Sequence, residues 1–260
     1  MRRLPLVVMF SLMAMPLHAD EPAANEAKAW TQRRHAEFLQ YQIAQRAADG
    51  ETALKFEPTS LLSWSNPLRE TPAGAVYLWT LDGRPRLIAS TYPYTEGIEQ
   101  ELTSLSELPL VARRDGQPLH RFTPGIEWKP VPDADPPVAS RSLRLTQMRR
   151  IAERFRVTGG DGNKSRKFEA RQLTQPIYRA PADARADAAL FAFVQGTDPE
   201  AVLLVEAVDS TGWRYALARM TVVPIAADLD DARVWELPSN WSIRTAQDQP
   251  FRTVQLPGAQ

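Results

Sequence analysis

Alternating apolar and polar residues predict antiparallel strands through much of the chain. In the segment Gly74–Tyr94, apolar residues flank Asp82-Gly83, a pair that tolerates the positive φ angles of a two-residue hairpin turn. Pro85 has no backbone N–H, so we expect this end of the second strand to be an edge. The expected register pairs Trp79 with Arg86, Tyr77 with Ile88 and Thr80 with Pro85.

The strongest strand signal lies at Ala189–Val208 and Trp213–Val223, where three apolar runs are separated by turn-prone segments. Both faces of this meander are apolar, so we expect both to be covered. Weaker patterns predict a strand at Ile98–Ser106, a hairpin at Leu110–Phe122 around Asp115-Gly116, a strand at Phe168–Tyr178 interrupted at Pro176, and a short strand at Arg233–Leu237.

Two segments are predicted to be helices. Glu26–Ala48 contains no Pro or Gly and is rich in Ala, Gln, Glu and Arg. Ser142–Val157 carries apolar residues on one stripe at helical period and arginines opposite. Thr158–Asn163 then predicts a polar loop, and the tail from Gln247 is polar enough to be loose.

These elements predict an α+β fold, in which a largely antiparallel sheet is packed by the two helices. The 22 prolines gather in connecting stretches, most densely in Thr123–Ala139. We interpret that segment as an irregular crossing anchored by Trp128. Residues 20–260 are expected to form one domain, with the crossing as the candidate boundary if there are two.

The N-terminus has the layout of a secretory signal peptide. Arg2 and Arg3 precede an apolar run, Leu4–Leu17, and Leu17-His18-Ala19 is a serviceable cleavage site. The alternative is a membrane anchor, but the run is shorter than the roughly 20 residues needed, and prolines interrupt it. We expect residues 1–19 to be removed and no stable membrane insertion afterwards.

Composition limits where in the cell the protein can act and which classes of partner it can bind. The chain has no cysteine, so disulfides, thiol catalysis and Cys-linked lipid anchors are excluded. Its 31 Lys and Arg residues balance 31 Asp and Glu residues, and signal removal takes away two arginines. This balance provides no field for nucleic acid. We expect export in a bacterium, to the periplasm or the exterior.

Glu206 is the one candidate catalytic residue. If Val208 and Trp213 close the second hairpin of the meander, Glu206 lies opposite Tyr215 and shares a face with apolar side chains. A carboxylate in such surroundings can have a raised pKa and act as an acid or base. The alternative is a structural pair with Tyr215 or a nearby arginine.

Other chemistry finds little support. The sequence contains no Gly-x-Ser-x-Gly elbow and no His-Glu-x-x-His motif, so nothing assigns His35 or His120 to a catalytic triad or a zinc site. The acidic stretches Asp133–Asp135 and Asp228–Asp231 could bind Ca²⁺, but they match no EF-hand loop and we interpret them as solvated. The arginine face of Ser142–Val157 could bind an anionic partner, such as an acidic glycan or lipid headgroups, but we interpret it as a solvated face. We therefore expect no metal and no cofactor.

Several blocks resemble a family of uncharacterised secreted bacterial proteins. They are GAVYLWTLDGRPRLIASTYPY (Gly74–Tyr94), IEWKPVP (Ile126–Pro132), RLTQMRRIAERF (Arg144–Phe155), LTQPIYR (Leu173–Arg179) and the meander. The resemblance implies an exported bacterial protein and brings no known activity. The expected helix-then-sheet order is also loosely similar to nuclear-transport-factor-2-like cones, which can hold a pocket between helix and sheet.

Two functions follow as hypotheses. The first is a non-enzymatic envelope or extracellular protein that binds a small ligand or another protein, with the aromatic residues near the sheet, Trp79, Trp213 and Tyr215, forming a concave or exposed surface. The second is a hydrolase or isomerase with Glu206 as the base in a pocket between helix and sheet, where Tyr215 or Arg219 binds and orients the substrate or stabilises developing negative charge. The oligomeric state is left open.

Overall fold

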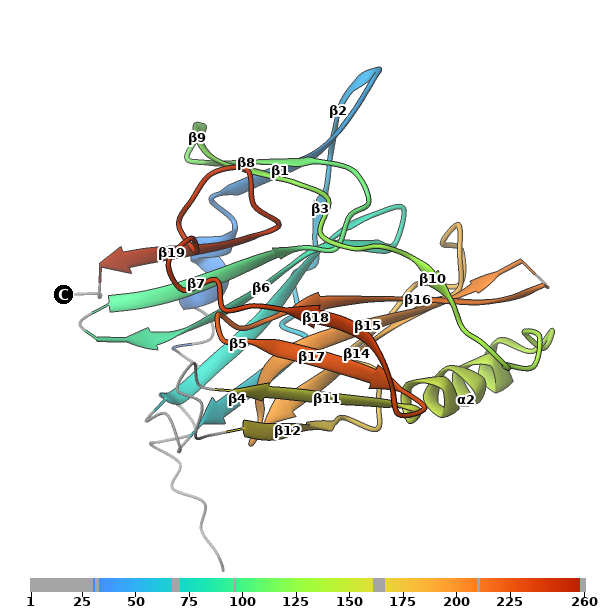
Figure 1. The fold of residues 1–260 in the computed structure, drawn as a ribbon. Helices are drawn as coiled ribbons and strands as arrows, with labels where there is room; N and C mark the ends of the chain where they lie inside the picture. Colours follow the sequence, from blue (N-terminus) through green and yellow to red (C-terminus); the bar gives the residue numbers. More distant parts are fainter. Residues whose placement is uncertain are drawn as a thin grey trace, which may run out of the picture.

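A computed structural model describes residues 30, 33–66, 71–95, 97–160, 167–209 and 211–257. Of these described residues, 56% are in strands and 9% are in helices. Among them, α2 (Arg141–Ala152) is the only helix of seven or more residues. Figure 1 shows curled antiparallel sheets dominating the molecule. The α+β prediction is therefore wrong. The predicted signal peptide lies outside the described residues.

Three antiparallel sheets contain the strands. The four-stranded sheet has the order β2 (Gly50–Ala53), β1 (Tyr41–Ala47), β8 (Leu110–Arg114), β9 (Gln117–Phe122). The six-stranded sheet has the order β19 (Phe251–Pro257), β7 (Gly97–Ser104), β6 (Arg84–Tyr94), β5 (Thr71–Leu81), β3 (Lys55–Phe56), with β4 (Leu62–Asn66) also on β5.

The nine-stranded sheet comes mostly from the C-terminal half. Its order is β10 (Lys129–Pro130), β16 (Gly212–Arg219), β15 (Asp198–Val208), β14 (Ala188–Gln195), β12 (Lys167–Gln172), β11 (Phe155–Gly160), β17 (Ile225–Leu229), β18 (Ala232–Leu237), with β13 (Tyr178–Arg179) on β14.

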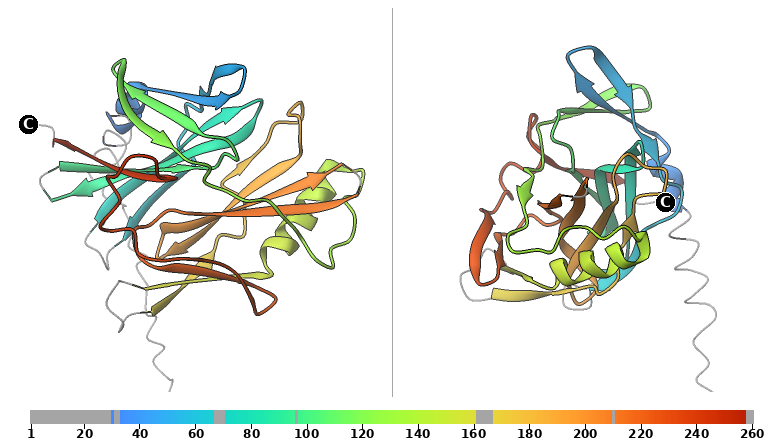
Figure 2. Two further views of the ribbon diagram at one scale, coloured as in Figure 1. Left: turned by 45° about the horizontal axis from the view of Figure 1, so that its top comes forward. Right: turned by 90° about the vertical axis from the view of Figure 1, so that its right-hand side faces the viewer.

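Three apolar cores hold these sheets and helix α2 together. One lies between the four- and six-stranded sheets and includes Phe38, Tyr77 and Trp79. A second lies between the six- and nine-stranded sheets. The third fills the concave side of the nine-stranded sheet, which α2 covers with Met148 and Ile151 (Figure 2). The prediction that both faces of the meander are covered is confirmed.

The first predicted helix, Glu26–Ala48, is wrong over its second half. Residues 33–38 are helical, but Tyr41–Ala47 is strand β1, paired with β8 and β2. Helix-favouring composition is a weak prior, and the pairing with β8 buries Tyr41 and Ile43 in a core. The similarity to a nuclear-transport-factor-2-like cone depended on a long N-terminal helix, and this finding removes that basis.

The second predicted helix, Ser142–Val157, is correct only as far as Ala152. Its last turn carries Arg149 and Arg150, which suit the negative end of the helix dipole. The apolar stripe does point to the core, but Phe155 reaches it from strand β11, which also takes up Thr158–Gly160 of the predicted loop.

Both Asp-Gly hairpins are confirmed. Asp82 and Gly83 have φ angles of 51° and 73°, and Asp115 and Gly116 have 50° and 75°. Thr80 lies opposite Pro85 as expected, but a bulge inserts Arg86, so Trp79 faces Leu87 and Tyr77 faces Ala89. Pairing of β6 with β7 begins at Leu87, which leaves Pro85 beyond the end of that ladder.

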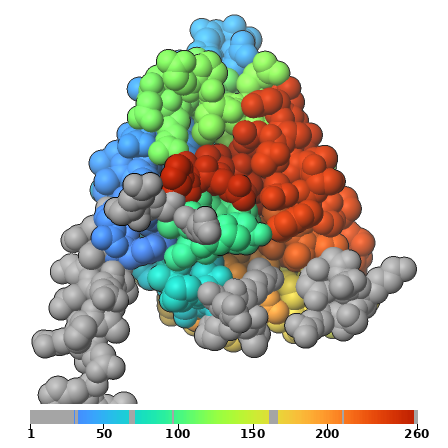
Figure 3. All heavy atoms as spheres, turned by 90° about the vertical axis from the view of Figure 1, so that its left-hand side faces the viewer, coloured from blue at the N-terminus to red at the C-terminus, as the bar shows by residue number. Residues whose placement is uncertain are grey.

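The C-terminal tail is not loose. Strand β19 pairs along β7 in the six-stranded sheet, so the prediction for the tail from Gln247 is wrong. In the space-filling view of Figure 3, atoms of the C-terminal segment, in red, cross this face next to green atoms from residues near position 100. The crossing Thr123–Ala139 joins the two halves of the chain, and β19 returns to the six-stranded sheet formed by the first half. That the chain forms a single domain stays a prediction.

The strands predicted at Ile98–Ser106 and Arg233–Leu237 are confirmed, and Phe168–Tyr178 is split between β12 and β13.

Candidate functional site

The junction between the six- and nine-stranded sheets gathers the polar groups with the most unusual surroundings. Its centre is apolar. We call Arg84, Glu206, Arg214 and Trp128 the arginine–glutamate cluster. We call Glu99, Glu101, Asp198 and Glu200 the acidic cluster. An open pocket, the junction pocket, lies at the β5–β6 turn.

In the arginine–glutamate cluster, one carboxylate is held by two guanidinium groups. Arg84, which follows the β5–β6 turn, lies with its Nη2 2.8 Å from Oε2 of Glu206 on β15. Arg214 on β16 donates from Nε to Oε1 over 2.9 Å. The Trp128 ring stacks on Arg214, with 4.4 Å from its centroid to Cζ. The cluster therefore ties the two sheets together with the Glu206 side chain only 4% exposed.

The register of the β15–β16 hairpin decides these partners. Val208 pairs with Gly212, one residue short of the expected Trp213, so Glu206 faces Arg214 and Tyr215 faces Val205. A one-residue shift moves every side chain of a strand to the other face. The expected pairing of Glu206 with Tyr215 is wrong, while the structural pair with nearby arginines is present.

The four predicted binding residues are all buried, in three separate places. Trp79 is 1% exposed in the core beneath the four-stranded sheet, and Trp213 and Tyr215 are 3% and 4% exposed in the core under α2. Arg219 is 6% exposed, and its guanidinium donates to the carbonyls of Thr221, Val223 and Pro238. The four therefore do not form one exposed surface, and Trp213 borders a small cavity of about 160 Å³.

The acidic cluster lies at the other end of the junction. Glu99 and Glu101 project from β7, and Asp198 and Glu200 from β15, and all four are less than 10% exposed. The Tyr92 hydroxyl donates to Oε1 of Glu101 over 3.1 Å. Asn66 donates from Nδ2 to Oδ2 of Asp198 over 3.1 Å. This chemistry was not anticipated from the sequence.

Burial dominates the electrostatics of this cluster. It raises the pKa of Glu101 well above its ordinary value, and the neighbouring charges of Asp198 and Glu99 add to the increase. Burial also raises the pKa of Glu99. Burial lowers the pKa of Arg219 to about 10, against which the charge of Glu101 acts. Burial thus shifts both glutamates of β7, Glu99 and Glu101, toward their protonated forms.

A signal for the acidic cluster did exist in the sequence. Glu99, Glu101 and Thr103 alternate along a predicted strand, so they share one face. Asp198 and Glu200, however, fall in Gln195–Glu200, a segment that the pattern assigns to a turn. Their burial follows from the stacking of β15 on the six-stranded sheet, which local patterning does not reveal.

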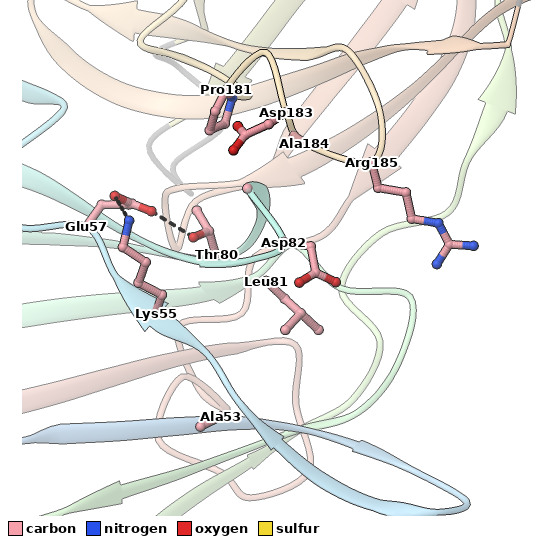
Figure 4. A pocket seen from close by; sticks show the side chains of 11 residues that line it. Ala53, Lys55, Glu57, Thr80, Leu81, Asp82, Pro181, Asp183, Ala184 and Arg185 are labelled. Atoms are coloured by element: carbon pink, nitrogen blue, oxygen red, sulfur yellow. Dashed lines mark hydrogen bonds and ion pairs between the residues drawn. The ribbon is translucent and has the colours of Figure 1, made fainter.

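The junction pocket has a volume of about 670 Å³ and is lined by both halves of the chain. Lys55 and Glu57 form an ion pair at 3.2 Å, and Thr80 donates to Glu57 over 2.8 Å. Figure 4 shows Asp183 on the loop side, facing this group, while Arg185 extends away. The pocket therefore offers a ligand both carboxylates and an ammonium group.

The remaining sequence candidates have structural surroundings. His120 is buried beside Phe122, with Nε2 3.0 Å from the Gln249 carbonyl, and His35 stacks near Phe56. Asp228 and Asp230 are paired with arginines. Within the described ranges, no group of three or more His, Asp or Glu residues could hold a metal ion. No helix there is long and apolar enough to cross a membrane.

Comparison with known proteins adds no assignment. The sequence matches no protein-family model, no curated protein and no solved structure.

Proposed function

We propose that this is an exported bacterial protein that binds a small, charged, polar ligand in the junction pocket without transforming it. The observation that carries the proposal is the pocket itself, because segments from both halves of the chain line it and side chains of both charges face it. Its volume of about 670 Å³ lies within the range typical of small-molecule sites.

The charges favour a ligand that carries an amino group. Glu57, Asp82 and Asp183 line the pocket together with Lys55 and Arg185; Lys55 is paired with Glu57, and Arg185 extends away from this group. An ammonium group can donate to carboxylates in a charge-assisted hydrogen bond. The proposed ligand class is therefore a small amine, with an amino acid or short peptide also able to use Lys55.

The test is identification of whatever the protein carries from its own compartment. The full chain is expressed in a bacterial host, purified from the envelope or medium, and analysed by native mass spectrometry. Wild type and the control Asp49→Arg, in the exposed β1–β2 turn, are expected to retain one small molecule. Asp183→Arg places a second cation opposite Lys55 and is expected to lose it. No bound molecule, or equal retention by both variants, contradicts the proposal. Recovery from the cytoplasm alone contradicts export.

The alternative function is a hydrolase or isomerase with Glu206 as its base. A general base must reach the proton that it removes. The Glu206 side chain is 4% exposed and both of its oxygens contact guanidinium groups, which favours a structural role. Once any substrate is found, unchanged turnover by a folded Glu206→Gln variant removes Glu206 from the mechanism, whereas loss of turnover with unchanged binding supports the enzyme.

A further inference from the structure

A second pocket, the outer pocket, lies on the four-stranded sheet. It has a volume of about 360 Å³ and is lined by residues of β1, β2, β8 and β9, together with Gln247. This volume is at the lower end of the range typical of small-molecule sites. None of its lining residues lines the junction pocket, so it is a separate candidate site.

Strand register places the charged lining residues on one face of the sheet. Val111 lies opposite Arg121, and Arg113, two positions further along β8, shares the face of Val111. Arg46 lies opposite Glu51 in the β1–β2 ladder. The other face of the sheet packs on an apolar core. Three arginines and one glutamate therefore border one common space.

Two of these arginines share one carboxylate. Arg113 donates from Nη1 to Oε2 of Glu51 over 3.1 Å, and Nε of Arg46 lies 4.0 Å from Oε1 of Glu51. Within the described ranges, neither arginine has another carboxylate partner. Arg121, by contrast, donates to both oxygens of Asp248 over 2.7 Å. Arg46 and Arg113 together thus carry one positive charge more than Glu51 balances.

A ligand can reach these charged groups from solvent. The side chains of Arg46, Arg113 and Glu51 are 59%, 38% and 37% exposed. A guanidinium group carries five N–H donors. Arg113 makes one hydrogen bond to Glu51, and the contact of Arg46 with Glu51 is too long to be one. Most of their donors are therefore available to an acceptor that enters the pocket.

Apolar side chains and a bulge shape the rest of the outer pocket. Val111 and Leu119 line it, and Leu119 has no partner residue on β8 because the β8–β9 ladder is irregular after Ala112. Gln247, from a distant part of the sequence, donates from Nε2 to the Leu119 carbonyl over 3.1 Å. Bulges re-aim side chains and are frequent beside functional sites. The pocket therefore combines apolar side chains with cationic ones.

We propose that the outer pocket binds a small monocarboxylate with an apolar body, such as an aromatic or short-chain aliphatic acid. Its carboxylate binds Arg46 and Arg113, since guanidinium groups suit carboxylates and Glu51 already presents one to both arginines. Its apolar body packs on Val111 and Leu119. The site shares no lining residue with the junction pocket, so it is independent of the amine ligand proposed there.

The test titrates the purified full-length protein with benzoate and follows its backbone amides by two-dimensional NMR at constant ionic strength. Benzamide, which has the same shape without the charge, and acetate, which lacks the apolar body, are the comparison probes. Benzoate is expected to shift amide signals of β1, β8 and β9 saturably. Acetate should bind more weakly, and benzamide should leave these signals unchanged.

Variants of opposite sign separate a built site from general attraction or loss of structure. Arg113→Gln and Arg46→Gln should each weaken benzoate binding about fivefold, the upper end for a partly exposed charge pair. Glu51→Gln frees both guanidinium groups and should tighten binding instead. The control Arg150→Gln removes an exposed arginine outside the pocket, without an ion pair in the described part of the chain, and it should bind as wild type does.

The proposal is overturned if benzoate causes no saturable shift, if the shifted amides lie outside the outer pocket, or if benzamide or acetate binds as tightly as benzoate. It is also overturned if folded Arg113→Gln and Arg46→Gln proteins both bind as wild type does, if Arg150→Gln weakens binding as much as they do, or if Glu51→Gln weakens it. None of these results bears on the amine ligand, because its test uses Asp183 in the other pocket.

Discussion

Glu206 and Glu101 occupy opposite ends of one junction and are both buried, but their surroundings differ. Glu206 contacts two guanidinium groups, one from each sheet. Glu101 contacts a tyrosine hydroxyl and lies near other acids, which raise its pKa further. Both carboxylates are buried, so the difference lies in their partners. Guanidinium partners let the buried charge of Glu206 join the two sheets, whereas acidic neighbours make a charge on Glu101 oppose their association.

Glu206→Gln should have the largest effect on stability. It leaves Arg84 and Arg214 without a countercharge, and loss of one partner in a buried ion pair costs about 3 kcal/mol in the free energy of unfolding. Urea unfolding measures the loss. Arg121→Gln breaks an exposed pair with Asp248 and should change little; an equal loss in both variants would show that the cluster at Glu206 is not special.

Glu101→Gln should act in the opposite direction above acidic pH. A carboxyl group whose folded pKa is raised above its ordinary value of 4.5 contributes stability below that value and loses it as pH rises through the folded pKa. The advantage of the variant over wild type should therefore grow between about pH 5 and pH 8. Urea unfolding at both pH values tests this, with exposed Glu153→Gln as the control. A pH-independent difference would contradict the raised pKa.

Tyr92→Phe should have the smallest effect. It removes the hydroxyl that donates to Glu101, a loss of about 1 kcal/mol. This hydrogen bond lowers the pKa of Glu101, so its removal should also steepen the dependence of stability on pH. In a double-mutant cycle, the effect should shrink when Glu101→Gln is already present. Additive effects would mean that the two side chains do not interact.

Local sequence was enough where a turn needs special backbone angles. Asp82-Gly83 and Asp115-Gly116 predicted two hairpins because few other residue pairs adopt positive φ at both positions. The apolar runs of β14 to β16 were equally plain, since both of their faces are buried. These signals depend on residues close together in the chain.

The partners of Glu206 depend on the register of the β15–β16 hairpin, which differs by one residue from the predicted register. The loop after Val208 is shorter than the pattern suggested, and this moved Tyr215 to the other face and brought Arg214 to Glu206. Arg84, the second partner, is 122 positions away in sequence. The bulge at Arg86 is equally hidden, because a bulge depends on how two strands meet.

The sequence by itself determined which segments could form hairpins and which residues could not do cysteine or motif-based chemistry. Only the tertiary structure decided that Tyr41–Ala47 is a strand, that Phe251–Pro257 pairs with β7, and which carboxylates are paired or crowded. The reason is that turn angles and alternation are local properties. Pairing, register and the charge around a buried group depend on residues that folding brings together from distant parts of the chain.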